Sequence, residues 1–279
     1  MAVPWGLPWT AVDDRPIGMF DSGFGGLTVA RAVIDLLPAE DLVYFGDTGR
    51  YPYGPRPLAE VREFAHQIAD VLVREFGVKM IVVACNTAAA AALDDLRFGF
   101  DVPVVGVISP GARSLVTATR NGRVGVIGTV GTISSGAYQR EVAALRSGVR
   151  LTCAACPGFV EFVERGDTAS EQVHVLAERL LEPVRTAGVD TLLLGCTHYP
   201  FLARTIADVM GRDVVLVSSA DETAFEVMAI LRDTGLGRRT AAKGEHRFLS
   251  SGDAAWFREL GTRLLGPELD VDVEARHWD

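Results

Sequence analysis

Hydrophobic residues in this chain gather in short runs, and each run ends at a glycine or a polar residue. The clearest run covers residues 191–194 and is followed by Gly195, Cys196, Thr197 and His198. A short, continuous apolar run is typical of a parallel strand that is buried on both faces. Because ligands of open α/β sheets bind at the carboxyl ends of the strands, the residues after this run are candidates for a functional site.

A second run has the same build. Residues 78–84 are apolar except for Lys79, and they are followed by Cys85, Asn86 and Thr87, with Cys85 placed 111 residues before Cys196. An alanine-rich helical stretch follows, so Asn86 and Thr87 are expected in its first turn, where such residues cap a helix and where an anion is favoured. Two strand ends are therefore predicted to present a thiol each.

The other runs alternate with helical patterns. Strands are predicted over residues 17–20, 42–46, 81–83, 102–108, 123–128, 150–156, 191–194 and 214–217, with an edge strand at 247–251. Helices are predicted over residues 27–37, 58–76, 88–93, 134–145, 172–186 and 220–234. The Gly-rich turn Asp21-Ser22-Gly-Phe-Gly-Gly lies between a strand and a helix, which suits an anion-binding turn or a purely structural one.

The two halves repeat one layout of strands and helices at a spacing of about 111 residues. This repeat predicts an α/β fold made of two pseudo-symmetric, doubly wound domains with the active site in the cleft between them. Residues 1–16 are expected to form an N-terminal arm, residues 17–109 with 218–279 a discontinuous first domain, and residues 110–217 the second. The closing stretch 270–279 is acidic and is expected on the surface.

Composition narrows the classes of partner. The 279 residues carry a formal net charge of −9, and the four cysteines are too few for a disulfide framework. An acidic chain of this kind is expected to bind neither nucleic acid nor an anionic membrane directly. No apolar run approaches the roughly 18 residues that span a bilayer, and the first residues do not resemble a signal peptide, so a cytoplasmic protein is expected.

Two thiols that face one ligand from opposite sides suit a proton transfer that inverts a carbon stereocentre. Such a reaction needs a base on one face and an acid on the other, and a thiol/thiolate pair serves both directions. A free thiol titrates near about 8.5, so each needs polar partners. Asp21 is the candidate partner for Cys85, and Glu164 and His198 are the candidates for Cys196.

Other interpretations of these residues stay open from the residues alone. A cysteine after an apolar strand is often a core residue. A zinc site made of Cys85, Cys196, His198 and a carboxylate is possible, although Cys-x-His lacks the usual ligand spacing. Cys153 and Cys156 form a C-x-x-C pair without a second pair or a thioredoxin-like context, which favours structural thiols.

Five motifs together resemble those of the glutamate racemases within the aspartate/glutamate racemase superfamily. They are Asp21-Ser-Gly-Phe-Gly-Gly-Leu-Thr28, Asp47-Thr with Tyr51-Pro-Tyr-Gly54, Cys85-Asn-Thr-Ala88, Cys156-Pro with Glu164, and Gly195-Cys-Thr-His-Tyr-Pro200. The resemblance runs from about Ile17 to Leu231. It implies interconversion of L- and D-glutamate without a cofactor or a metal, which supplies D-glutamate for peptidoglycan synthesis.

The resemblance also implies roles for single residues. Cys196 would remove the α-proton of L-glutamate and Cys85 that of D-glutamate, with Asp21, Glu164 and His198 as their partners. The ammonium group would contact Asp21 and Ser22. The α-carboxylate would be held by Asn86, Thr87 and Thr197, and the side-chain carboxylate by Tyr53, Gly54 and neighbouring backbone amides.

At the level of the family, the resemblance implies a homodimer and, in some members, binding to DNA gyrase. Three alternatives remain beside glutamate racemisation. The chain could racemise aspartate, another acidic substrate or a hydantoin, although the Tyr-Pro-Tyr-Gly loop favours glutamate. It could be a two-domain protein that closes on an amino acid without chemistry, or a gyrase-binding regulator with vestigial catalysis.

Overall fold

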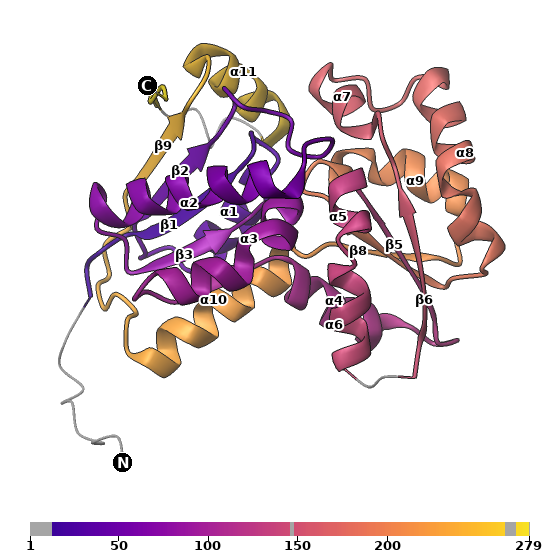
Figure 1. Cartoon of the computed structure of the whole chain (residues 1–279), viewed down its shortest axis with the longest axis horizontal. Coiled ribbons are helices and arrows are strands. Elements are labelled where there is room, and N and C mark those ends of the chain that lie inside the picture. Colours follow the sequence, from indigo (N-terminus) through magenta and orange to yellow (C-terminus); the bar gives the residue numbers. More distant parts are fainter. Residues whose placement is uncertain (1–12, 146–147, 266–271, 279) are drawn as a thin grey trace.

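The computed structural model describes residues 13–145, 148–265 and 272–278 (Figure 1). Most of the predicted arm, residues 1–12, lies outside the described residues. The strands are β1 (Ile17–Asp21), β2 (Leu42–Gly46), β3 (Met80–Val83), β4 (Val104–Gly106), β5 (Arg123–Gly128), β6 (Arg150–Ala155), β7 (Thr191–Gly195), β8 (Val215–Val217), β9 (His246–Ser250) and β10 (Val273–Ala275). The helices are α1 (Leu27–Leu36), α2 (Leu58–Arg74), α3 (Asn86–Gly99), α4 (Ile108–Ala118), α5 (Val130–Ser134), α6 (Ala137–Ala144), α7 (Phe159–Glu164), α8 (Glu171–Thr186), η1 (Tyr199–Leu202), α9 (Ala203–Met210), α10 (Ala220–Thr234) and α11 (Ala254–Leu265).

The described strands form two parallel sheets that share one core order. The first sheet has the order β10-β9-β2-β1-β3-β4 and the second β6-β5-β7-β8. The four strands β2-β1-β3-β4 therefore match β6-β5-β7-β8 one for one. In each sheet the chain order reverses beside the first strand, and this reversal opens a crevice at the carboxyl ends of the strands. The predicted fold class, two doubly wound α/β units related by pseudo-symmetry, is confirmed.

The strands follow from their composition. Every residue of β1, β3 and β7 is buried, because helices cover both faces of each parallel sheet and leave no solvated side for polar residues. Helix α2 instead buries a single stripe made of Val61, Ala65, Ile68 and Leu72. That spacing of three and four residues is the one a helix needs to pack one face on a sheet.

Two helices cross from one half of the chain to the other. Helix α4 follows β4 of the first sheet but packs on α6, β7 and β8 of the second half, and α10 follows β8 of the second sheet but packs on α1 of the first. The chain thus passes between the halves at the β4–α4 and β8–α10 connections (Figure 1). We propose domain boundaries close to those expected from the sequence, with residues 108–109 moved into the second domain because they begin α4.

Several local predictions were wrong. The predicted strand 102–108 is shortened to β4, and the predicted domain boundary after residue 109 falls inside α4. The predicted helix 134–145 is present as α6 but begins three residues later, after Gly136, whose φ of 69° is in the left-handed region, and the short helix α5 before it was not predicted. Glycine adopts this region without a steric penalty, so the chain turns there.

The segment after residue 246 also departs from the prediction. Strand β9 is not an edge strand, because β10 pairs with it on its outer side. Residues 273–275 of the acidic closing stretch form this added strand. Residues 272 and 274–277 are exposed, as expected, and the Trp278 side chain is half-buried. No described helix is long and apolar enough to cross a membrane.

Candidate active site

The candidate residues gather where the carboxyl ends of the two sheets face each other. Asp21 ends β1, and Cys85 follows β3 as the N-cap of α3. In the second half, Thr129 follows β5 and Cys196 follows β7. These are the central strand pairs of the two sheets, so the pseudo-symmetry places one thiol at the matching position of each half.

Cys85 lies in a buried pocket of polar groups from the first half. Its Sγ accepts a hydrogen bond from the Ala88 N–H at 3.5 Å and lies 3.8 Å from the Ser22 Oγ. The Ser22 hydroxyl in turn donates to Asp21 Oδ1 at 3.0 Å, and the same oxygen accepts the Gly23 N–H at 3.1 Å. Cys85 is 5% exposed and Asp21 is fully buried, so the thiol and its acidic neighbour are both shielded from solvent.

Cys196 has a matching surrounding in the second half. Its Sγ lies 3.9 Å from His198 Nδ1, and His198 Nε2 lies 3.7 Å from Glu164 Oε1. Glu164 comes from the end of α7, a helix that the sequence pattern did not predict. Neither the His198 Nε2 nor the Glu164 Oε1 has a hydrogen-bond partner among the described residues. The two atoms face each other at a distance that is longer than a hydrogen bond.

Contacts between the two halves close the site. The Thr197 hydroxyl donates to Asp21 Oδ2 at 2.9 Å, and the Thr87 and Thr129 hydroxyls are 2.9 Å apart. The Gly131 N–H donates to the Gly54 carbonyl at 2.9 Å. Asn86 Nδ2 donates to the Tyr138 hydroxyl at 2.8 Å. Each pair joins a residue of the first half to a residue of the second, and together these contacts close the site.

Both thiols are held in their protonated form by this closure. Burial, together with the charge of Asp21, raises the pKa of Cys85 to about 12. Burial, together with the charges of Cys85 and Asp21, raises the pKa of Cys196 well above its usual value. Backbone N–H groups oppose these effects at both sulfurs, namely those of Ser22 and Ala88 for Cys85 and those of His198 and Tyr199 for Cys196. The site therefore holds two buried, protonated thiols, one at the matching strand end of each half.

Comparison with known proteins agrees with this geometry. Residues 22–226 match the family model of the Asp/Glu/hydantoin racemases. The chain belongs to this racemase family. The racemase is 56% identical to a glutamate racemase of Mycobacterium leprae over 262 residues, which cover 94% of this chain and 96% of that protein.

Solved structures of glutamate racemases have the same fold. The glutamate racemase isoform RacE1 from Bacillus anthracis superposes with a TM-score of 0.87 at 41% identity, over 95% of this chain and 97% of that one. The glutamate racemase from Francisella tularensis in complex with D-glutamate gives a TM-score of 0.86 at 33% identity, over 95% of this chain and 98% of that one. These relatives and the family match establish that the chain is a racemase enzyme.

The structure places the residues proposed from the sequence near one another, but not all of their side chains point into the cleft. The Tyr53 hydroxyl is bonded to the buried carboxylate of Asp47, so this side chain points into the first domain and not into the cleft. The Thr87 hydroxyl is engaged with those of Thr129 and Thr132. Asn86 keeps its Oδ1 without a hydrogen-bond partner among the described residues.

Three residues at the site, Thr129, Thr132 and Tyr138, were not singled out in the sequence, and Tyr51 was quoted there only as part of a motif, without a role. Thr129 and Thr132 pair with Thr87, Tyr138 pairs with Asn86, and the Tyr51 ring centroid lies 6.1 Å from that of His198. The repeat could have predicted Thr129, because this residue follows β5 in the second half, where the first half has Asp21 and Ser22 at the end of β1. Tyr138 lies inside a helix, and no pattern in the sequence sets it apart from a core tyrosine.

The metal interpretation finds no support in the described part of the racemase. Among those residues, no group of three His, Cys, Asp or Glu side chains is placed to hold a metal ion. Cys153 and Cys156 are free thiols, and burial raises their pKa values to about 11 and about 12. The C-x-x-C pair therefore consists of protonated, packed thiols.

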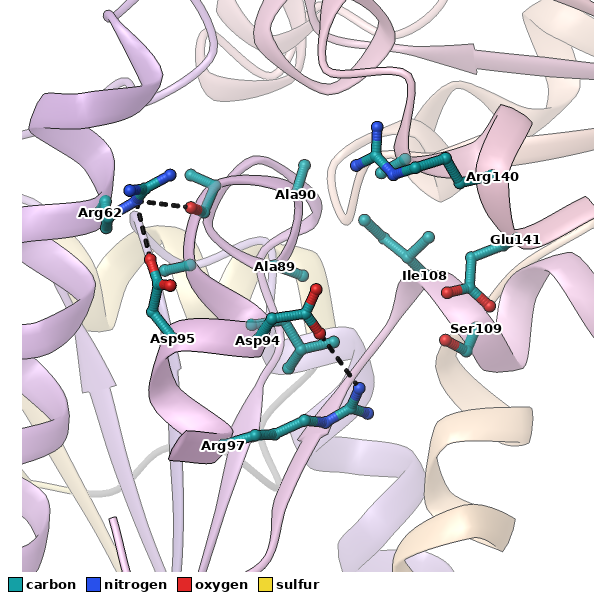
Figure 2. A pocket seen from close by; sticks show the side chains of 14 residues that line it. Arg62, Ala89, Ala90, Asp94, Asp95, Arg97, Ile108, Ser109, Arg140 and Glu141 are labelled. Atoms are coloured by element: carbon teal, nitrogen blue, oxygen red, sulfur yellow. Dashed lines mark hydrogen bonds and ion pairs between the residues drawn. The ribbon is translucent and has the colours of Figure 1, made fainter. Parts of the chain in front are cut away.

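A separate cavity of about 240 Å³ lies on the outer side of α3, between the two halves (Figure 2). It is lined by residues of α2, α3, α4 and α6 and holds none of the candidate site residues. Four of its charged groups form two ion pairs in the wall, Arg62 with Asp95 and Arg97 with Asp94 (Figure 2), and Arg140 and Glu141 of α6 line it as well. Around the cysteines, four buried polar atoms lack a hydrogen-bond partner among the described residues: the Tyr51 hydroxyl, Asn86 Oδ1, Glu164 Oε1 and His198 Nε2.

Proposed function

We propose that this racemase interconverts L- and D-glutamate and that Cys85 and Cys196 act as the two acid/base catalysts. The observation that carries the proposal is the placement of a buried thiol at the matching strand end of each half, with each sulfur facing two backbone N–H groups. The names of the relatives support glutamate as the substrate. A reaction that uses a single thiol would not require a second thiol at the matching position.

Racemisation then proceeds by two proton transfers on opposite faces of the α-carbon. The Cys196 thiolate removes the α-proton of L-glutamate, so the C–H bond breaks, an S–H bond forms, and the electron pair moves into the α-carboxylate. The Cys85 thiol delivers its proton to the other face, which forms the new C–H bond and leaves a thiolate. The reverse direction begins from this thiolate with D-glutamate, and each turnover exchanges the roles of the two sulfurs.

Substrate binding supplies the means of forming a thiolate. The negative charge of Asp21 raises the pKa of both thiols. An ammonium group bound to Asp21 and Ser22 neutralises that charge, so it lowers the pKa of both sulfurs when the substrate arrives. The proton of the thiol that becomes the base passes to its polar partner, which is His198 Nδ1 for Cys196 and Asp21, through the Ser22 hydroxyl, for Cys85, and the thiolate forms in the complex.

The carboxylates of glutamate are held by neutral donors. We assign the α-carboxylate to the side chains of Asn86, Thr87 and Thr197, which border the cysteines. The side-chain carboxylate would bind at Gly54, with Tyr53 contributing its backbone because its hydroxyl is already bonded to Asp47. Glu164 and His198 act as the polar partners of Cys196. Preorganised hydrogen-bond donors of this kind stabilise charge that develops on the α-carboxylate during proton removal.

The test is incubation of the purified protein with each enantiomer of glutamate in D2O, with optical rotation and α-deuterium measured together. Cys85→Ala and Cys196→Ala should each lower racemisation by about 10³-fold or more. Cys196→Ala should still exchange the α-proton of D-glutamate, and Cys85→Ala that of L-glutamate. Cys153→Ala, which removes a thiol away from the cleft, is the matched control.

Wild-type protein that binds glutamate without rotation change or exchange would overturn the proposal in favour of a binding or regulatory protein. Faster turnover of L-aspartate than of L-glutamate in the same assay would make aspartate, and not glutamate, the substrate. In the cell, we propose that the D-glutamate formed enters peptidoglycan. The homodimer and the binding of DNA gyrase stay predictions from the family, and sedimentation of the purified protein with and without gyrase tests both. The cytoplasmic location stays a prediction from the sequence pattern.

A further inference from the structure

The loop of residues 47–54 is anchored by one buried carboxylate. Asp47 is fully buried, and its Oδ1 accepts hydrogen bonds from Ser251 Oγ at 2.6 Å and Trp278 Nε1 at 2.7 Å. Its Oδ2 accepts from Arg50 Nε at 2.7 Å and from the Tyr53 hydroxyl. A buried charge is stable only when its acceptor sites are filled in this way, so each of the four donors helps to hold the loop.

Trp278 is the donor that comes from farthest along the chain. It follows β10, and its indole ring lies 3.8 Å from the Arg50 guanidinium carbon, measured to the ring centroid. Phe64 covers the other side of the same guanidinium at 4.1 Å. The Arg50 side chain is therefore stacked between two aromatic rings, an arrangement that fixes both its plane and its position.

The anchored loop reaches the active site directly. Tyr51 packs beside the ring of His198, and the Gly54 carbonyl accepts the Gly131 N–H from the second half. Tyr51 and Gly54 therefore border the catalytic groups, while Asp47 and Arg50 lie toward Trp278. A displacement at the Asp47 end is passed to the Tyr51 end through only a few backbone bonds.

We propose that Trp278 is a positioning residue for the racemisation proposed above. Its N–H and its ring together hold Asp47 and Arg50, and through them they set the place of Tyr51 and Gly54 at the cleft. The residue does not touch the reacting atoms. The effect that we expect on racemisation rests on the proposed function, whereas the anchoring of the loop by Trp278 rests on its geometry alone.

The alternative is that Trp278 merely stabilises the fold. Two variants separate the cases. Trp278→Phe keeps an aromatic ring on Arg50 but removes the N–H donor to Asp47, and Trp278→Ala removes both. Glu274→Gln is the matched control, because it weakens the exposed pair between Glu274 and Arg247 at 2.9 Å, which ties β10 to β9 without contact to Asp47.

The experiment measures kcat and KM for both enantiomers of glutamate together with amide hydrogen exchange in the native proteins. We expect kcat/KM to fall about tenfold in Trp278→Phe and about 100-fold in Trp278→Ala, the size of effect that a displaced site loop produces. Exchange should speed up in residues 48–54 while β1 and β3 keep their protection. Glu274→Gln should match the wild type in both measurements.

Wild-type kinetics in both tryptophan variants would overturn the proposal. So would a loss of activity that comes with equally faster exchange in β1, β3 and the loop, since that is the signature of global destabilisation. If the wild-type protein itself does not racemise glutamate, the proposed function fails, and the exchange data alone decide. In that case selective loosening of residues 48–54 supports the anchoring by Trp278, and uniform or unchanged exchange refutes it.

Discussion

The hydrogen bond from Thr197 to Asp21 joins the two halves of the racemase, and Thr197→Val removes it with little change of shape. Asp21 is fully buried. Its Oδ1 would keep the Ser22 hydroxyl and the Gly23 N–H as donors. Its Oδ2, which accepts from Thr197 at 2.9 Å, would lose the hydrogen bond that this structure shows for it.

The size of the effect follows from the burial of both partners. A hydrogen bond to a charged group contributes about 1.5 to 3 kcal/mol, and an unsatisfied buried acceptor loses most of that amount. Thr197 is only 6% exposed, so water does not readily replace its hydroxyl. We therefore expect Thr197→Val to lower the free energy of unfolding by about 2 kcal/mol, which corresponds to about 4 to 8 °C in Tm for a chain of this length.

Urea unfolding followed by tryptophan fluorescence and by circular dichroism checks this value. Coincidence of the two curves establishes that one free energy describes the transition. Thr197→Ser is the matched control, because it keeps the hydroxyl and should unfold near the wild type. The reasoning is refuted if Thr197→Val unfolds at the same urea concentration as Thr197→Ser, since the link between the halves would then contribute nothing measurable.

Three further changes test other parts of the structure. Gly25→Ala would place a methyl group against the His198 ring, so racemisation should fall about 100-fold while the circular dichroism spectrum stays unchanged; full activity would contradict this packing. Burial raises the pKa of Cys85 from 9.0 to about 12, so the folded state binds more protons than the unfolded state in that window. The free energy of unfolding should therefore fall as the pH rises from about 9 to 12, and urea titrations should show a smaller decline for Cys85→Ser; equal slopes would argue against the shift. Lys79 and Glu40 form a buried ion pair, so Lys79→Met should lower the free energy of unfolding by about 3 to 5 kcal/mol, and the double variant Lys79→Met with Glu40→Leu should regain part of it in the same assay; additive losses would show that the pair is not coupled.

The strands and the thiols could be predicted because each depends on local composition. A continuous apolar run such as residues 191–194 is typical of a strand buried on both faces. Because the strands of a parallel sheet run in one direction, Cys85 and Cys196 each lie at the carboxyl edge of a sheet. The helix α4 was missed because Ser109, Pro110 and Gly111 are turn-forming residues by themselves. Packing on β7 and β8 stabilises a helix that local propensity disfavours.

Taken alone, the sequence predicted the two-fold layout of the chain and the residues that we propose carry its chemistry. The repeat of apolar runs is a feature of the linear sequence, so it can be recognised without coordinates. Only the tertiary structure shows which groups contact each other. The Thr197 hydroxyl donates to Asp21, α4 packs on the second half and α10 on the first, and Trp278 donates to Asp47. These contacts join residues up to 231 positions apart, and such pairings depend on how whole sheets and helices pack, which no local pattern of residues records.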